Sequence, residues 1–161
     1  MQQQFPIRIV GIGSPHGDDQ FGWLAAEYLR QSAAFQAGYG SQVEILTCSA
    51  PINSILDEVI DSRALIVLDA VVSGSKPGTV MRIEEEVLPE IQVAYSSHGI
   101  SVAQVIELGR SLDVLPKHVV LLGVELESCE SGAPVGQVLE RSLERVEQLV
   151  VEEIEFINCY G

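Results

Sequence analysis

Residues 7–19 read IRIVGIGSPHGDD, an apolar run that passes through two glycines into a polar turn and two aspartates. The run Ile7–Gly13 is short, rich in isoleucine and valine, and closed by glycine, which predicts a buried first strand. Apolar residues then recur at helical spacing from Phe21 onward, and they predict an amphipathic helix over residues 19–35. A buried strand that turns directly into a helix is typical of an α/β fold.

The same two patterns alternate along the rest of the chain. Ser101 and Gln104 are spaced as the capping box of a further helix, whose inner face is expected to extend to Leu112. The remaining predicted elements are strands at 43–47, 64–69, 79–83 and 119–125, and helices at 52–60 and 135–157. Strands that alternate with helices imply a three-layer α/β domain over residues 1–161, with a mostly parallel, twisted, five-stranded sheet and helices on both faces. The strand at 79–83 is expected at an edge.

Charge and hydropathy exclude several classes of protein. The chain has 161 residues, 47% of them apolar, and a formal net charge of −14. Such a chain repels phosphate backbones, so nucleic acid is not an expected partner. No apolar run has the length of a membrane span, and the first residues lack the pattern of a signal peptide. The sequence therefore predicts a soluble, cytoplasmic protein without a membrane partner.

The cysteines give no sign of a disulfide framework or a zinc site. Cys48, Cys129 and Cys159 are odd in number and form no Cys-x-x-Cys pair. They are expected to be mostly buried, small apolar residues that take no part in chemistry.

Three polar residues are expected at one edge of the sheet. Asp19 follows the first strand, Asp69 is predicted as the last residue of the strand at 64–69, and His98 precedes a helix. Functional sites of open α/β sheets lie beyond the carboxyl ends of the strands, where these three can meet. Two carboxylates and an imidazole suit nickel, zinc or cadmium, and they leave coordination positions open.

Each of the three residues also has a simpler interpretation. Asp19 could be a helix cap, Asp69 a turn residue at the end of its strand, and His98 a surface residue at the start of a helix. It is the shared position that favours a metal site. His16 could join it from the turn before Asp19, although an exposed turn residue is the preferred interpretation. His118 precedes the last strand and is expected at the opposite edge.

Two other chemistries fit the sequence less well. The spacing Gly11-x-Gly13 resembles a dinucleotide loop, but Gly17 comes one position late and Asp18 would repel a pyrophosphate. The glycines are better explained by a tight turn. A Ser-His-Asp hydrolase could use Ser14 or Ser97, but the sequence has no Gly-x-Ser-x-Gly elbow.

Four segments of the chain form a recognisable series. They are GIGSPHGDD at 11–19, the run from DA at 69–70 to PGT at 77–79, SSH at 96–98 and LGVE at 122–125. Together they resemble the motifs of the endopeptidases that mature nickel-iron hydrogenases. The resemblance covers nearly the whole chain in the same order. It implies a twisted, mostly parallel sheet flanked by helices, and it matches Asp19, Asp69 and His98 to the metal-contacting positions of the family.

The resemblance also implies an activity. Members of this family are aspartic-type endopeptidases that remove a C-terminal extension from the precursor of the hydrogenase large subunit after nickel insertion. Asp19 and Asp69 would then be the catalytic residues, nickel would arrive with the precursor, and cadmium or zinc could replace it in crystals. The alternative is a non-catalytic, nickel-dependent chaperone of the same large subunit.

Overall fold

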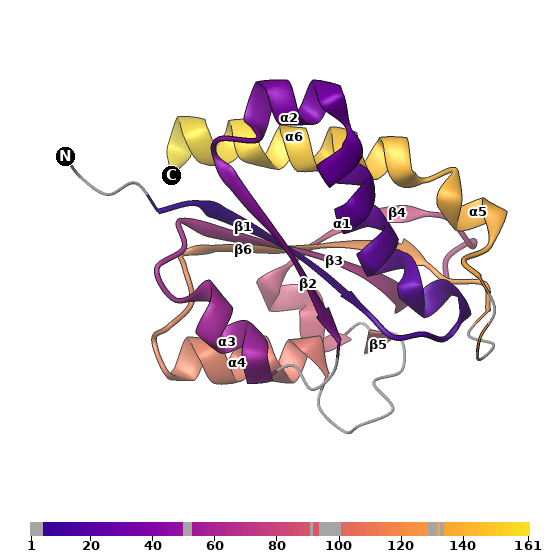
Figure 1. Cartoon of the computed structure of the whole chain (residues 1–161). Helices are drawn as coiled ribbons and strands as arrows, with labels where there is room; N and C mark the ends of the chain where they lie inside the picture. The colour runs from indigo at the N-terminus through magenta and orange to yellow at the C-terminus, as the bar shows by residue number, and fades with distance from the viewer. Residues whose placement is uncertain (1–4, 50–52, 91, 94–100, 129–131, 133) are drawn as a thin grey trace.

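The sheet is built around the apolar strands at residues 7–13 and 64–72. The structure is a computed structural model, and it describes residues 5–49, 53–90, 92–93, 101–128, 132 and 134–161. Strands run in the order β2-β1-β3-β6-β4 (Figure 1). Their bounds are Ile7–Gly13 for β1, Val43–Ser49 for β2, Ala64–Val72 for β3, Val80–Glu84 for β4 and His118–Glu125 for β6.

Most strand pairs in this sheet are parallel. β1 pairs in parallel with β2 and β3, and β3 pairs in parallel with β6. At the edge, β4 pairs antiparallel with β6. The α/β fold and its mostly parallel sheet are therefore confirmed. A sixth, two-residue strand that the sequence did not predict, β5 (Gln92–Val93), pairs antiparallel with the end of β3.

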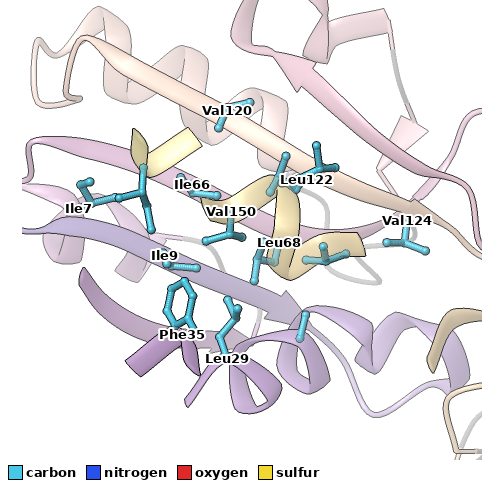
Figure 2. Packing of buried hydrophobic residues seen from close by; sticks show 14 of the residues in the cluster. Ile7, Ile9, Leu29, Phe35, Ile66, Leu68, Val120, Leu122, Val124 and Val150 are labelled. Atoms are coloured by element: carbon cyan, nitrogen blue, oxygen red, sulfur yellow. The ribbon is translucent and has the colours of Figure 1, made fainter. Parts of the chain in front are cut away.

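Helices cover both faces of the sheet. One face carries α1 (Phe21–Gln31), α2 (Ala33–Tyr39) and α6 (Leu143–Tyr160), and the other carries α3 (Asn53–Val59), η2 (Glu85–Glu90) and α4 (Val102–Ser111) (Figure 1). Alternate residues of β3 divide between two apolar clusters. Ile66 and Leu68 pack toward α1 and α6, as Figure 2 shows, whereas Val67 packs toward α3 and α4. β3 is thus buried on both faces, as its continuous apolar run predicts.

The helix predicted over residues 19–35 is in fact interrupted. It begins as a short 3-10 helix, η1 (Gly17–Gln20), continues as α1, and stops at Ser32, whose ψ of 106° is extended. The Ser32 hydroxyl accepts a hydrogen bond from the backbone N–H of Phe35 at 3.3 Å and so caps α2. Serine favours this capping role over a helix interior, and the break turns Phe35 into the core.

Other predicted bounds differ from the structure. Asp69 is not the last residue of its strand, because β3 continues to Val72 and pairs there with β5 and β6. The closing helix is divided into α5 (Gln137–Glu140) and α6 by a turn at Ser142, whose hydroxyl donates to the carbonyl of Leu139 at 2.5 Å. The predicted capping box of α4 is confirmed, but Leu112 follows the end of that helix and is 58% exposed.

Candidate active site

Close packing of α1 against β1 sets the position of the aspartates. A Cβ on Gly11 would lie 2.1 Å from the carbonyl oxygen of Gly22, and a Cβ on Gly22 would lie 1.9 Å from that of Ile12. Only glycine fits at both positions, so the helix can approach the strand directly. This approach places η1, with Asp18 and Asp19, immediately beyond the carboxyl end of β1. Gly11 lies inside β1 and Gly22 inside α1, so both serve the contact between strand and helix, whereas Gly17, with a φ of 53°, lies in the turn itself.

Asp19 is buried and held by the turn that precedes it. Its side chain is 5% exposed, and its Oδ2 accepts a hydrogen bond from the Ser14 hydroxyl. The backbone N–H of Asp19 donates to the carbonyl of His16 at 3.0 Å. Burial raises the pKa of the Asp19 carboxyl, while the Ser14 hydrogen bond and the nearby His16 act in the opposite direction. The carboxylate is therefore fixed in orientation and only partly compensated in charge.

Asp69 lies within β3 and is more deeply buried. Its register partner is Gly123 of β6, and its side chain is 2% exposed. Burial raises the pKa of Asp69 well above its usual value, and the negative charge of Asp19 raises it further. Residue alternation along β3 directs Asp69 to the same face as Val67 and Val71, which α3 and α4 cover. The structure thus brings two of the three predicted site residues close together.

Two like-charged carboxyl groups in a buried site cannot both ionise cheaply. They either share a proton or face a cation that compensates the two charges. The Asp19–Asp69 pair is therefore suited either to acid–base chemistry or to binding of a divalent ion. Both require the two carboxyl groups to lie close together.

The third predicted ligand, His98, lies outside the described residues, so its position remains a prediction. Val93 on one side of it pairs with Val71, and Ser101 on the other side begins α4. Within the described part of the chain, no three His, Cys, Asp or Glu side chains form a group that could hold a metal ion. His16 is half-buried and close enough to Asp19 to lower the pKa of that carboxyl.

Asp18 has a different role from its neighbour Asp19. Its Oδ2 accepts hydrogen bonds from the backbone N–H groups of Glu127 and Ser128, each at 2.8 Å, and its Oδ1 accepts one from Gly136 at 2.8 Å. The carboxylate thus ties the loop after β6 and the start of α5 to η1. Sequence reasoning did not find this role, because the three donors lie more than a hundred residues away along the chain.

Glu125 is a second buried acid that the sequence did not reveal as structural. Its carboxylate accepts hydrogen bonds from the Ser73 backbone N–H at 2.9 Å, the Ser73 hydroxyl at 2.6 Å and the Gly74 N–H at 3.1 Å. These bonds fix the loop that leaves β3 a few residues after Asp69. The LGVE segment quoted above was the only sequence signal that pointed to this residue.

The competing serine chemistry has little support. The Ser14 hydroxyl donates to Asp19, and Ser97 lies outside the described residues. His118 begins β6 at its amino end, which confirms its predicted place opposite the aspartates, and its Nε2 lies 2.9 Å from Glu153. Cys48 is half-buried, whereas Cys159 is exposed near the end of α6, so the expectation of buried cysteines is wrong for Cys159. Cys129 lies outside the described residues.

Comparisons with known proteins agree with one another. A family model described as "Hydrogenase maturation protease" (HycI) matches residues 24–153, a span that includes Asp69 but begins after Asp19. The hydrogenase expression/formation protein HupD of Thiocapsa roseopersicina is 28% identical over 165 residues, which cover 100% of this chain and 72% of the relative.

Solved structures give the same result. The hydrogenase maturating endopeptidase HybD from E. coli superposes with a TM-score of 0.75 at 25% identity, covering 94% of this chain and 93% of the other. The [NiFe] hydrogenase maturation protease HycI from Thermococcus kodakarensis gives a TM-score of 0.69 at 24% identity and shares the fold, with 94% and 93% covered. Across the described residues, the structure contains no helix long and apolar enough to span a membrane.

Proposed function

This chain belongs to the hydrogenase maturation protease family, and we propose that it removes the C-terminal extension from the large-subunit precursor of a nickel-iron hydrogenase. The observation that supports this most directly is the buried Asp19–Asp69 pair, whose pKa values are raised by burial and, for Asp69, by the neighbouring Asp19. A pair of this kind is maintained at the carboxyl edge of the sheet although it costs stability.

The donor set of the pair fits a divalent ion. A cation between Asp19 and Asp69 would compensate both charges and make ionisation of both carboxyls favourable. Oxygen ligands joined by an imidazole from His98 would suit nickel, and zinc or cadmium could substitute. In the proposed reaction the nickel belongs to the substrate, since it is carried by the precursor, and it would polarise the carbonyl of the scissile peptide bond.

The residues of the site would then have separate roles in the reaction. Asp19, Asp69 and His98 bind and orient the nickel-bearing precursor, and the Ser14 hydroxyl holds Asp19 in position. One of the two carboxylates accepts a proton from the attacking water, which makes this an aspartic-type hydrolysis. The water oxygen bonds to the carbonyl carbon, the peptide C–N bond breaks, and the leaving amine takes a proton. The protein would act in the cytoplasm, where the precursor is assembled.

The same geometry explains why cleavage would depend on nickel. An empty precursor offers no cation to the Asp19–Asp69 pair, so binding would leave buried like charges uncompensated. A loaded precursor supplies that cation, and this gives the enzyme a free-energy difference between the two forms of its substrate.

The experiment is an incubation of the purified protein with precursor that has been prepared with and without nickel. Intact-mass measurement should show a single loss near the C-terminus for the loaded precursor alone, and casein should remain uncut. Binding without any mass change would instead support the nickel-dependent chaperone. Equal cleavage of loaded and empty precursor would contradict the role assigned to nickel.

A nickel titration of the isolated protein tests the ligand assignment separately. Asp69→Ala should bind nickel at least about tenfold more weakly than wild type, since loss of one ligand from a small set removes a large share of the affinity. Equal affinities would remove Asp69 from the metal site whatever the precursor assay shows.

A further inference from the structure

The positive charges of this acidic chain are unevenly placed. The chain has nine lysines and arginines against 23 aspartates and glutamates. Three of the nine, Lys76, Arg141 and Arg145, line one cavity of about 510 Å³. The cavity lies between the loop before β4 and the start of α6. Its lining residues, all of them described, include no carboxylate.

The three cations remain largely available to a ligand. All three side chains are exposed. Within the described residues, Lys76 and Arg141 form no ion pair. Arg145 lies 3.4 Å from Glu152, but both side chains of that pair are more than half exposed, and such pairs contribute little. Lys117 and Arg63 also form no ion pair among the described residues, but Lys76, Arg141 and Arg145 share one cavity whose lining has no carboxylate.

The turn that carries Lys76 is held rigidly. The backbone N–H of Gly78 donates to the carbonyl of Glu125 at 2.8 Å, and the Thr79 hydroxyl donates to that of Lys76 at 2.6 Å. Gly78 has a φ of +84°, and a Cβ there would lie 2.7 Å from Val138 of α5. Glycine therefore lets the turn lie against α5, so that Lys76 and Arg141 line the same cavity.

The cavity faces the same edge of the sheet as the aspartate pair. Val80, in its lining, pairs with Val124 of β6, which in turn pairs with Ala70, the residue after Asp69. Two strand spacings, about 10 Å along the sheet, therefore separate the row of Asp69 from the row of the cavity. The cavity lies beside α5 and α6 on one face of the sheet, whereas Asp69 points to the face covered by α3 and α4, so a partner reaches both around the carboxyl edge. A protein that covers the aspartate pair can also reach the cavity, because an interface of ordinary size, about 800 Å² on each partner, is several times wider than about 10 Å.

From this arrangement we propose that Lys76, Arg141 and Arg145 form a docking pocket for an acidic segment of the protein substrate. The proposal rests on the function proposed above, because it takes the substrate to be a folded protein bound at Asp19 and Asp69. Carboxylates of the substrate would pair with the two guanidinium groups, which bind them in a bidentate geometry. The contact would orient the precursor and offset the repulsion between an acidic protease and an acidic partner segment.

Charge reversal in the pocket tests the proposal against a matched control. Arg141→Glu changes the net charge by the same amount as Lys117→Glu, and Lys117 is an exposed residue without an ion pair that precedes the amino end of β6. Steady-state cleavage of nickel-loaded precursor should show KM raised about tenfold in Arg141→Glu and further in Lys76→Glu/Arg141→Glu, with kcat unchanged. Lys117→Glu should resemble wild type. Added salt should raise the KM of wild type more than that of the double variant.

The outcomes separate this proposal from the function itself. If the wild type cuts the precursor and Arg141→Glu and Lys117→Glu have the same KM, the pocket is not a docking site. If the wild type cuts nothing, the affinity of each variant for fluorescently labelled precursor replaces KM as the measurement, and a selective loss in the pocket variants still supports the proposal. If the variants lose affinity for inorganic phosphate but not for precursor, the pocket is a small-anion site and the proposal is overturned.

Discussion

At the amino end of β6, the buried carboxylate of Glu153 contacts the guanidinium of Arg82 and the Nε2 of His118. At the other end of the sheet, Asp19 after β1 and Asp69 within β3 are equally buried, but there the nearest charge to Asp69 is that of another acid. The same sheet therefore buries carboxylates at both ends, once beside the guanidinium of Arg82 and once beside a second carboxyl group.

The difference separates the acids that have partners inside the chain from the proposed catalytic pair. Glu153, Asp18 and Glu125 each have their oxygens occupied by donors of this chain. For Asp69, by contrast, the neighbouring charge is that of Asp19, which is expected of a site that takes up an external cation. Burial alone does not separate these two groups, since all five side chains are 5% exposed or less.

The largest effect is expected when the charge of the pair is removed. Asp19→Asn and Asp69→Asn keep the size of the side chain but lose the carboxylate, so each should lower the rate of precursor processing by at least about 100-fold. Both variants should remain folded by circular dichroism, because neither creates a cavity. A variant that folds and retains full activity would mean that the pair is as structural as Glu153.

At the amino end of β6, a substitution is expected to lower the stability of the fold without lowering catalytic activity. Glu153→Gln leaves Arg82 and His118 without their charged partner and should lower the free energy of unfolding by about 1–3 kcal/mol. The partial exposure of Arg82 limits the loss, since its guanidinium can turn toward water. Urea unfolding measures this change, and kcat of the folded variant should equal that of wild type. A large drop in kcat would show that the amino end also serves the reaction.

The raised pKa values of Asp19 and Asp69 should make the free energy of unfolding depend on pH. The folded protein holds protons on Asp69 and Asp19 that the unfolded chain releases near pH 4, since both pKa values are raised. The free energy of unfolding should therefore fall as pH rises above about 4, by up to about 1.4 kcal/mol for each unit by which a pKa is raised. Asp69→Asn removes the larger contribution, so it should become more stable than wild type as pH increases.

Urea unfolding of wild type and Asp69→Asn at several pH values between 4 and 8, with EDTA present, measures this difference. The same comparison with Glu153→Gln serves as a control, because it leaves the aspartate pair intact. A wild-type-minus-Asp69→Asn difference that stays constant with pH would contradict an unneutralised charge at Asp69.

The smallest effect is expected from the cysteines. Replacement of Cys48, Cys129 and Cys159 by serine should leave kcat for precursor processing within about twofold of wild type. The three cysteines do not have the sequence spacing of metal ligands. A stability loss within about 1 kcal/mol is compatible with the half-buried position of Cys48. Abolished processing by a folded triple variant would place a thiol in the reaction.

Much of the architecture could be predicted because it depends on local patterns. Apolar runs predicted β1, β3 and β6 as strands, and the Ser101–Gln104 spacing predicted the start of α4. The break at Ser32 was missed, because an apolar stripe continues across it and the decisive contact is the burial of Phe35 against distant residues. The end of β3 was misplaced for a related reason, since Asp69 looks like a terminus until its partners in β6 are known.

The sequence by itself determined the fold class, and it predicted the edge of the sheet where chemistry is expected and Asp19 and Asp69 as candidate residues of that site. These follow from periodicity, glycine spacing and residue type, all of which are local. Only the tertiary structure decided that Asp18 ties two loops while its neighbour Asp19 lies close to Asp69, and that Lys76 and Arg141 line one cavity. Each of these roles depends on groups that are distant along the chain and adjacent in space, because hydrogen bonds, desolvation and Coulombic interactions act over ångströms and not over sequence separation.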